Sequence, residues 1–224
     1  MPDKHPMKSI NAMRVLCVTQ PQSKRIELSR LMYTAYWVDN KDITQRSVVD
    51  ELCRSVGVDS SVMDSERAKQ QLFDNTNESY SKGGFGVPTM FCTDTQGDTD
   101  RFFGGDRLHY VEMFFKVPNA QQYRAVPNKS LAVKPTIQFI FDFSSPWTYL
   151  AYTQLHELRQ QCIVQMVPVL LGAIFRSSGG PMLPMNAMSD NKRAYFRKDM
   201  QDTMKWHKIT KFQFNTHFPI VCII

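Results

Sequence analysis

Apolar positions in the first third of the chain recur at the spacing of an amphipathic helix. Over residues 24–39, the apolar positions that share one face are Ile26, Leu28, Leu31, Met32, Ala35 and Tyr36. A second helix is predicted after the turn at residues 42–44, ending at Gly57. A third is predicted from Ser61 to about Ser81, with Leu72 and Phe73 directed inward. Three helices therefore precede the first predicted strand.

The pattern changes at Gly83. Residues 87–92 and 101–103 have the β-branched and aromatic content of two short strands, joined by a polar turn. A helix capped by Asp106 is predicted over residues 106–116. The positions that we expect it to bury are Leu108, Val111, Phe114 and Phe115. This strand–turn–strand–helix order indicates an antiparallel pair covered by one helix.

Residues 117–135 contain three prolines and no helical stripe, which predicts a linker. Residues 136–143 then alternate as a strand does, with Ile137, Phe139, Phe141 and Phe143 on one face. Ser145-Pro146 begins a helix that is predicted to reach Arg159. Residues 163–171 are nearly all apolar, as in a strand buried on both faces. Such a strand–helix–strand unit predicts a right-handed parallel crossover.

The last predicted elements are a loop rich in Gly, Pro, Ser and Met over residues 172–188 and a helix over 189–207. Together, the two units supply the four strands and flanking helices of a thioredoxin-like α/β fold. Their order is reversed, because the strand–helix–strand unit comes second in this chain. We therefore expect three parts, at residues 1–116, 117–135 and 136–224.

Composition indicates a soluble globular protein. Hydrophobic residues make up 42% of the 224 residues and charged residues 21%, which is too apolar for a disordered chain. The longest apolar runs, such as residues 167–173, are less than half of a membrane span. The start of the chain has no signal-peptide or transit-peptide pattern. We expect a cytoplasmic location and no membrane partner.

The net charge is +6, and the positive charge is concentrated in residues 192–211. Aromatic residues within this segment leave nucleic-acid binding open as an alternative. Asp199 and Asp202 interrupt the basic run, however, and the aromatics recur at helical spacing. A solvated helix with buried aromatics is the better interpretation, so no nucleic-acid partner is expected.

Cysteine and histidine positions argue against redox and metal chemistry. The five cysteines include no pair at CxxC spacing, and the five histidines are dispersed. Without such motifs, neither a thioredoxin-type disulfide nor a metal site is predicted. Free thiols in a reducing compartment are expected.

Four stretches of the chain resemble a known family. They are residues 30–44 (RLMYTAYWVDNKDIT), 83–91 with 102–107 (GGFGVPTMF and FFGGDR), 141–151 (FDFSSPWTYLA) and 168–179 (PVLLGAIFRSSG). This set is similar to the 2-hydroxychromene-2-carboxylate isomerases and kappa-class glutathione transferases. The resemblance implies a DsbA-like thioredoxin fold, a four-stranded mixed sheet with a helical insertion, and glutathione as co-substrate. Its halves stand here in permuted order, as in a circular permutant or a fragment spanning two tandem copies.

The resemblance places Ser145 opposite the glutathione sulfur. A hydroxyl at a helix N-terminus donates to a thiolate, and the helix dipole adds positive potential there. The alternative is that Ser145 serves only as an N-cap before proline. Because Ser145 and Thr148 stand where a redox enzyme has two cysteines, the sulfur chemistry must come from the ligand.

The other expected ligand contacts fall in both halves. The resemblance implies a cis peptide between Val87 and Pro88, exposing backbone groups that pair with the cysteinyl part of glutathione; a plain strand-initiating proline is the alternative. Gly105 and Asp106 are expected to hold the γ-glutamyl end, although Asp106 equally fits an ordinary N-cap. Trp147 is also assigned to glutathione binding. Gly180 departs from the family, which commonly has asparagine there.

The leading hypothesis is therefore a glutathione-dependent isomerase or transferase acting on a small molecule. A non-catalytic glutathione-binding or protein-binding module is the second hypothesis. Protein disulfide exchange is disfavoured by the missing CxxC pair. A homodimer, including one formed by exchange of halves, stays open, and the family resemblance also leaves mitochondria or peroxisomes open as locations.

Overall fold

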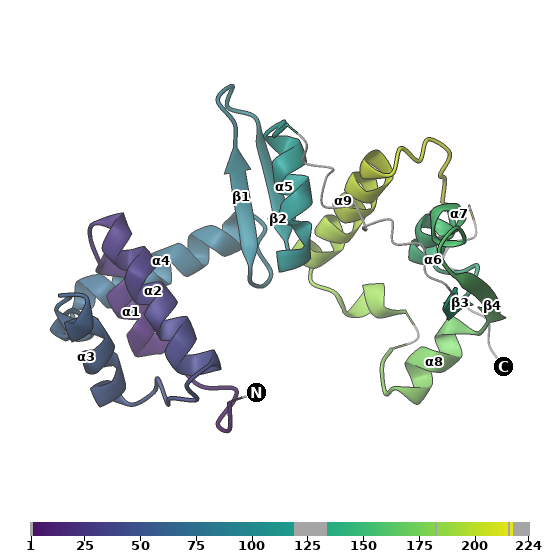
Figure 1. Ribbon diagram of the computed structural model, residues 1–224. Coiled ribbons are helices and arrows are strands. Elements are labelled where there is room, and N and C mark those ends of the chain that lie inside the picture. The colour runs from purple at the N-terminus through teal and green to yellow at the C-terminus, as the bar shows by residue number, and fades with distance from the viewer. Residues whose placement is uncertain (1, 119–133, 182, 215, 217–224) are drawn as a thin grey trace. The chain divides into compact units, whose positions relative to one another are not determined.

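A computed structural model describes residues 2–118, 134–181, 183–214 and 216 of the chain (Figure 1). Its contacts divide the chain into two compact units, Met1–Lys82 and Gly83–Ile224. Most of the linker predicted at residues 117–135 lies outside the described residues. Each unit is described below by itself.

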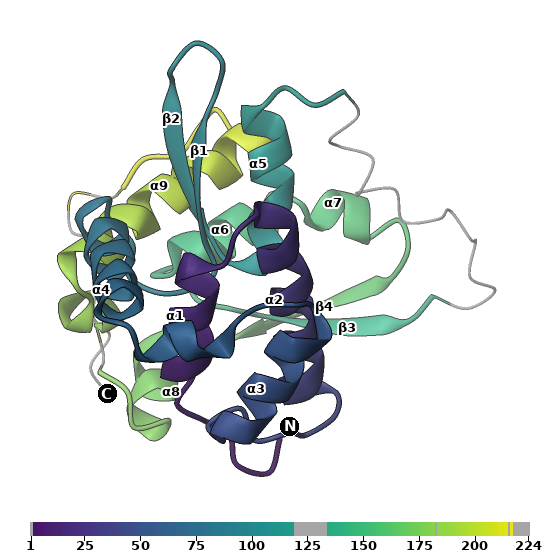
Figure 2. The ribbon, with the colours of Figure 1, turned by 90° about the vertical axis from the view of Figure 1, so that its left-hand side faces the viewer.

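The first unit is helical (Figure 2). Its elements are α1 (Ile10–Val18), α2 (Gln22–Trp37), α3 (Arg46–Ser55), the 3₁₀ turn η1 (Ser60–Asp64) and α4 (Glu66–Ser81). Its core draws on α1, α2, α3 and η1, and the fully buried members include Val15, Leu28, Val49, Cys53 and Met63. Burying such side chains is worth about 1.5–3 kcal/mol each, so one shared core holds these elements together.

The helix predicted over residues 61–81 is divided, and one of its inward positions was wrong. Ser65 accepts a hydrogen bond from the Ala68 backbone and begins α4 as a new helix after η1. Ala68 is fully buried, whereas Phe73 is 60% exposed. Phe73 follows Ala68 by five residues, so it lies on a different side of the helix. Helix α1 was not predicted as a separate element.

The second unit begins with an antiparallel hairpin, β1 (Thr89–Thr93) and β2 (Thr99–Phe103). The 3₁₀ turn η2 (Gly105–Arg107) and α5 (Leu108–Phe114) follow directly. The antiparallel pairing confirms the prediction. A core cluster forms here around Cys92, Phe102, Tyr110 and Trp206, of which Trp206 comes from the far end of the chain.

Two details of the helix predicted at residues 106–116 were wrong. Asp106 does not cap it, because its carboxylate pairs with the Arg107 guanidinium inside η2. Leu108 and Phe115 are 57% and 45% exposed, while Tyr110 is buried. The starting turn η2 rotates the helix so that its buried side is the one that carries Tyr110.

A parallel strand pair follows, β3 (Thr136–Phe141) and β4 (Ile163–Pro168), which confirms the predicted parallel pairing. The connecting helix is broken into α6 (Pro146–Tyr152) and α7 (Leu155–Leu158), and α8 (Leu171–Ser177) occupies part of the predicted loop. The prediction that residues 163–171 are buried on both faces was wrong, since Ile163 is 53% exposed and Met166 36%.

The four strands form two separate two-stranded sheets within the described residues, rather than the single four-stranded sheet that the pattern predicts (Figure 1). Periodicity identifies strands and their faces, but it does not identify non-local partners. The sheet edges that would join the pairs belong to segments far apart in the sequence.

The long helix α9 (Asp190–Trp206) follows the 3₁₀ turn η4 (Pro184–Ala187) and is capped by Ser189, which accepts from the Lys192 backbone. Its buried residues are Tyr195, Asp199, Met200 and Trp206. Along the described parts of the chain, each helix is too short or too polar to cross a bilayer.

Candidate functional site

One end of the β1–β2 hairpin brings together two turns that the sequence singles out. The Val87–Pro88 peptide bond is cis, as predicted. The Pro88 carbonyl accepts a hydrogen bond of 3.0 Å from the Gly104 backbone N–H. Gly104 has φ of 107°, a conformation that favours glycine. Val87, Pro88, Gly105 and Asp106 therefore lie at the same end of this hairpin.

This end of the hairpin leaves backbone groups accessible. Val87 is 88% exposed, and it precedes the β1–β2 ladder, which begins at Thr89. Within the described residues, its N–H and C=O have no hydrogen-bond partner. A Cβ placed on Gly105 would meet no atom within 4 Å. An extended ligand segment therefore has both unpaired backbone groups and open space here.

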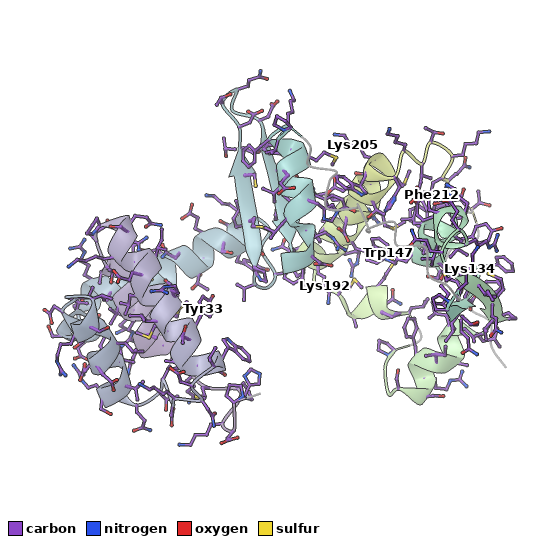
Figure 3. All side chains as sticks on the ribbon, viewed as in Figure 1. Tyr33, Lys134, Trp147, Lys192, Lys205 and Phe212 are labelled. Carbon is purple, nitrogen blue, oxygen red and sulfur yellow. The ribbon has the colours of Figure 1, made fainter. Side chains whose placement is uncertain are left out.

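Ser145 is the N-cap of α6, and its Oγ accepts from the Thr148 backbone N–H at 3.2 Å. Because Oγ accepts in this bond, its own proton stays available for donation. Ser145 borders an open pocket of about 350 Å³. The other lining residues are Phe143, Ser144, Pro146, Tyr149, Lys211, Phe212, Gln213 and Phe214. The pocket is thus aromatic with one cationic side chain, and Figure 3 labels its member Phe212.

Asp142 supports this end of α6, although sequence reasoning missed it. Its carboxylate accepts from the Leu171 backbone at 2.7 Å and the Ser144 backbone at 2.8 Å. Burial alone would raise the pKa of Asp142, but these hydrogen bonds prevail and hold the pKa below its usual value. One carboxylate thereby ties the start of α8 to the loop that carries Ser145. The available signal was its place three residues before an N-cap serine, a common turn position for aspartate.

Trp147, labelled in Figure 3, contacts α9. Its ring lies 5.5 Å from the ring of Phe196, in an edge-to-face arrangement that is favourable for aromatic pairs. This contact links α6, and hence Ser145 two residues earlier, to the middle of α9.

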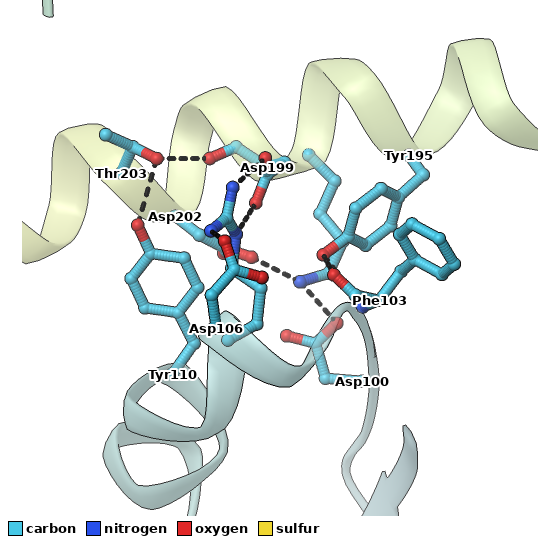
Figure 4. A network of polar contacts seen from close by, with 10 residues as sticks. Asp100, Phe103, Asp106, Tyr110, Tyr195, Asp199, Asp202 and Thr203 are labelled. Carbon is cyan, nitrogen blue, oxygen red and sulfur yellow. Dashed lines mark hydrogen bonds and ion pairs between the residues drawn. The ribbon is translucent and has the colours of Figure 1, made fainter. Parts of the chain in front are cut away.

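Polar side chains along α9 form hydrogen bonds with the hairpin end and with the helix that follows it (Figure 4). Asn191 donates to the Gly84 carbonyl at 3.2 Å, and the Tyr195 hydroxyl accepts from the Phe103 backbone N–H at 2.9 Å. Asp199 accepts two hydrogen bonds from Arg107, at 2.7 and 3.0 Å. Thr203 bonds the Tyr110 hydroxyl at 2.9 Å.

These α9 residues recur every fourth position, at 191, 195, 199 and 203, so they form one stripe on the helix. Their partners lie in the segment from Gly84 to Tyr110, more than 90 residues earlier in the chain. The stripe was visible in the sequence as polar spacing, but its partner was not. The bidentate Asp199 pair holds the pKa of Arg107 above its ordinary value.

A second ionic group lies beside this stripe. The Lys198 ammonium lies 2.9 Å from the Asp100 carboxylate and 2.5 Å from that of Asp202. It also lies 4.2 Å from the centre of the Phe102 ring. Burial raises the pKa of Asp202 above its usual value, and the hydrogen bond from Lys198 only partly opposes this. Two carboxylates of α9, Asp199 and Asp202, thus pair with cations at the same interface.

The predicted site residues fall into two groups. Val87, Pro88, Gly105 and Asp106 gather at the hairpin end, whereas Ser145 and Trp147 lie on α6. In the part of the chain that the structure describes, no hydrogen bond, ion pair or ring contact joins the two groups, and α9 contacts Phe103 beside the first group and Trp147 in the second. Their roles in ligand binding remain predictions.

Gly180 lies in a tight turn after α8, where its N–H donates to the Phe175 carbonyl at 2.8 Å. A Cβ there would lie 3.4 Å from that same carbonyl oxygen.

The described cysteines, Cys17, Cys53, Cys92 and Cys162, are free thiols. No three His, Cys, Asp or Glu side chains gather as metal ligands in the described ranges.

Comparison of the sequence with known proteins finds one domain family and two relatives that match part of the chain. The family model of the DSBA-like thioredoxin domain matches residues 1–116. Glutathione S-transferase kappa 1 of Caenorhabditis elegans is 28% identical over 130 residues, which cover 55% of this chain and 58% of that protein. Glutathione S-transferase kappa 2 of the same organism is 33% identical over 118 residues, covering 49% and 52%. The chain thus spans little more than half the length of these relatives.

Proposed function

Because the chain belongs to the DSBA-like thioredoxin domain family, we propose that it is a glutathione-dependent enzyme of the kappa transferase or 2-hydroxychromene-2-carboxylate isomerase type. The observation that carries this proposal is the hairpin end, where the Val87–Pro88 turn and the Gly104–Asp106 turn are hydrogen-bonded together. The similarity to two kappa glutathione transferases supports it.

Glutathione is held at the hairpin end by backbone groups. Its cysteinyl part pairs with the exposed N–H and C=O of Val87 as a short added strand. The γ-glutamyl carboxylate faces the open space at Gly105. The Asp106 carboxylate, which is 75% exposed and paired with Arg107, accepts from the γ-glutamyl ammonium.

Ser145 stabilises the thiolate by donating its hydroxyl proton. Lowering a thiol pKa by two units from about 8.5 requires roughly 2.7 kcal/mol of preference for the anion. A hydrogen bond to a charged group supplies about 1.5–3 kcal/mol, which is of the required size. Because α6 has no cysteine at its start, the reactive sulfur belongs to glutathione.

The co-substrate enters through the aromatic pocket beside Ser145. In the transferase reaction, the thiolate forms a bond to an electrophilic carbon, the leaving group on that carbon departs with its bonding electrons, and the sulfur stays attached. In the isomerase reaction, it adds to an unsaturated aromatic-derived acid, a bond rotates, and glutathione is expelled. The Lys211 side chain that lines the pocket suits an acid of this kind.

A second candidate function is glutathione binding without turnover. The residue that favours it is Gly180, which lacks the amide side chain that the related enzymes commonly present at this position. This candidate predicts binding of glutathione without consumption of a model electrophile such as 1-chloro-2,4-dinitrobenzene.

We also propose that residues 1–116 correspond to the C-terminal half and residues 136–224 to the N-terminal half of one thioredoxin-like domain, in permuted order. The hydrogen bonds between α9 and the segment from Gly84 to Tyr110 support this arrangement, because they join the two parts within one chain.

Isothermal titration calorimetry with glutathione tests the proposed function, and thiolate absorbance at 240 nm measured against pH tests the role of Ser145. We expect binding by the parent protein and a depressed pKa of the bound thiol. Ser145→Ala should raise that pKa by about one to two units. Ser144→Ala, at the neighbouring position on the same pocket, is the matched control and should leave it unchanged. Absence of glutathione binding by the parent protein would refute the proposal.

A further inference from the structure

Of two adjacent residues in the middle of α9, one contacts a neighbour of the hairpin-end group and the other contacts the α6 group of candidate site residues. Tyr195 contacts Phe103 at the end of β2, and Phe196 contacts Trp147 on α6. Neighbouring side chains on a helix point about 100° apart, so one turn of α9 reaches both Phe103 and Trp147.

Tyr195 is attached to the hairpin end by its hydroxyl. Only 5% of the residue is exposed. Its hydroxyl oxygen, Oη, accepts a hydrogen bond from the Phe103 backbone N–H at 2.9 Å. The same hydroxyl donates to the Phe103 carbonyl oxygen at 3.4 Å. The next residue, Gly104, donates to Pro88. The Tyr195 hydroxyl thus restrains Phe103, and the adjacent Gly104 joins the two turns that are predicted to bind glutathione.

The ring of Tyr195 adds a second restraint. It lies 5.5 Å from the ring of Phe85 and 6.1 Å from that of Phe103. Phe85 belongs to the glycine-rich loop that leads into the Val87–Pro88 turn. Hydroxyl and ring therefore act on both sides of the hairpin end, and removal of the hydroxyl alone leaves the ring contacts in place.

Phe196 acts on the other group through an apolar contact. Its ring meets Trp147 at 5.5 Å and 87°. Trp147 is the second residue of α6, which Ser145 caps. A change in this ring contact shifts the start of α6, and the distance of the Ser145 hydroxyl from a bound sulfur changes with it.

We infer that Tyr195 and Phe196 are positioning residues for two features of bound glutathione, its peptide backbone and its sulfur. Tyr195 positions the backbone that binds the γ-glutamyl and cysteinyl parts, and Phe196 positions Ser145 against the sulfur. This inference rests on the proposed function, because it assigns roles within the same site. Neither residue is placed in contact with the ligand or the reacting atoms.

The first experiment compares two tyrosines at the α9 interface. Tyr195→Phe removes the hydroxyl that holds Phe103, and Tyr110→Phe removes the hydroxyl that bonds Thr203. Both residues are buried, so the two changes are chemically matched. We expect Tyr195→Phe to raise the Kd for glutathione about fivefold to tenfold. Tyr110→Phe should change it less than twofold, at a comparable loss of thermal stability.

The second experiment separates an effect on glutathione affinity from an effect on the pKa of the bound thiol. Phe196→Leu keeps an apolar side chain but loses the ring contact with Trp147. We expect it to raise the pKa of the bound thiol, measured by thiolate absorbance at 240 nm, with the Kd for glutathione changed less than twofold. Tyr195→Phe should show the opposite division, with a weaker Kd and an unchanged thiol pKa.

The outcomes distinguish the inference from the proposed function. If the parent protein binds no glutathione, the proposed function and this inference both fail. If the parent protein binds but Tyr195→Phe and Tyr110→Phe weaken binding equally, or if Phe196→Leu and Tyr195→Phe change the same quantity, only the inference fails. A merely structural role predicts these parallel effects.

Discussion

The two strand pairs of the second unit are stabilised in different ways. The β1–β2 pair lies against a core cluster that includes Phe102, and hydrogen bonds and ion pairs attach it to α9. The β3–β4 pair leaves Ile140 and Ile163 more than half exposed. Its helix α6 contacts α9 through the rings of Trp147 and Phe196.

This difference indicates that the two parts of the candidate site are positioned with different precision. In the proposed function, the hairpin end binds glutathione through backbone groups whose positions must be held closely, and directional hydrogen bonds hold them. The α6 end presents one hydroxyl beside an open pocket, where an apolar contact tolerates more adjustment. We therefore expect fixed backbone positions at the β1–β2 end and a more adjustable position of the hydroxyl at the start of α6.

The largest effect is expected in the core of the hairpin. Phe102→Ala removes a ring that is 1% exposed and should lower the free energy of unfolding by about 3–5 kcal/mol. Phe139→Ala, in the half-buried β3, should cost roughly 1–2 kcal/mol, because less apolar area leaves water there. Urea denaturation measures both, and equal losses would contradict the comparison.

The next effect concerns the ionic contact. Asp199→Asn keeps the shape of the side chain but removes the buried anionic partner of the Arg107 guanidinium, which then pairs only with the exposed Asp106 carboxylate. We expect a loss of about 2–3 kcal/mol in the free energy of unfolding. Thr203→Val, one turn further along α9, removes a neutral hydrogen bond and should cost about 1 kcal/mol. A smaller loss for Asp199→Asn than for Thr203→Val would show that the charge pair adds nothing to the interface.

The smallest effect, with the opposite sign, is expected at Asp202. Because its pKa in the folded state is raised above 3.8, its stabilising contribution is complete below that pH and is lost as the pH rises through the folded pKa. Asp202→Asn mimics the protonated form and should be slightly more stable than the parent protein at pH 7. The gain should vanish near pH 3.5. Urea denaturation at both pH values measures it, and a loss of stability at pH 7 would mean that the Lys198 pair outweighs burial.

The parts of the site that sequence could predict are those with a local signature. Ser145 caps α6 because serine before proline suits a helix start, and the Val87–Pro88 bond is cis as the family resemblance implies. Asp142 and Tyr195 were missed because their roles depend on partners, Leu171 and Phe103, that only the folded chain brings near. The exposure of Leu108 was missed for the same reason, since the turn η2 changes the phase of the helix.

The amino-acid sequence by itself determined the periodicities, and with them the helical first unit, the antiparallel hairpin and the parallel crossover. Those features follow from local spacing, which a single segment carries. Only the tertiary structure decided that the strands pair in two separate sheets among the described residues and that α9 holds the hairpin end. Contacts between residues more than 90 positions apart depend on packing of the whole unit, and no local pattern encodes their partners.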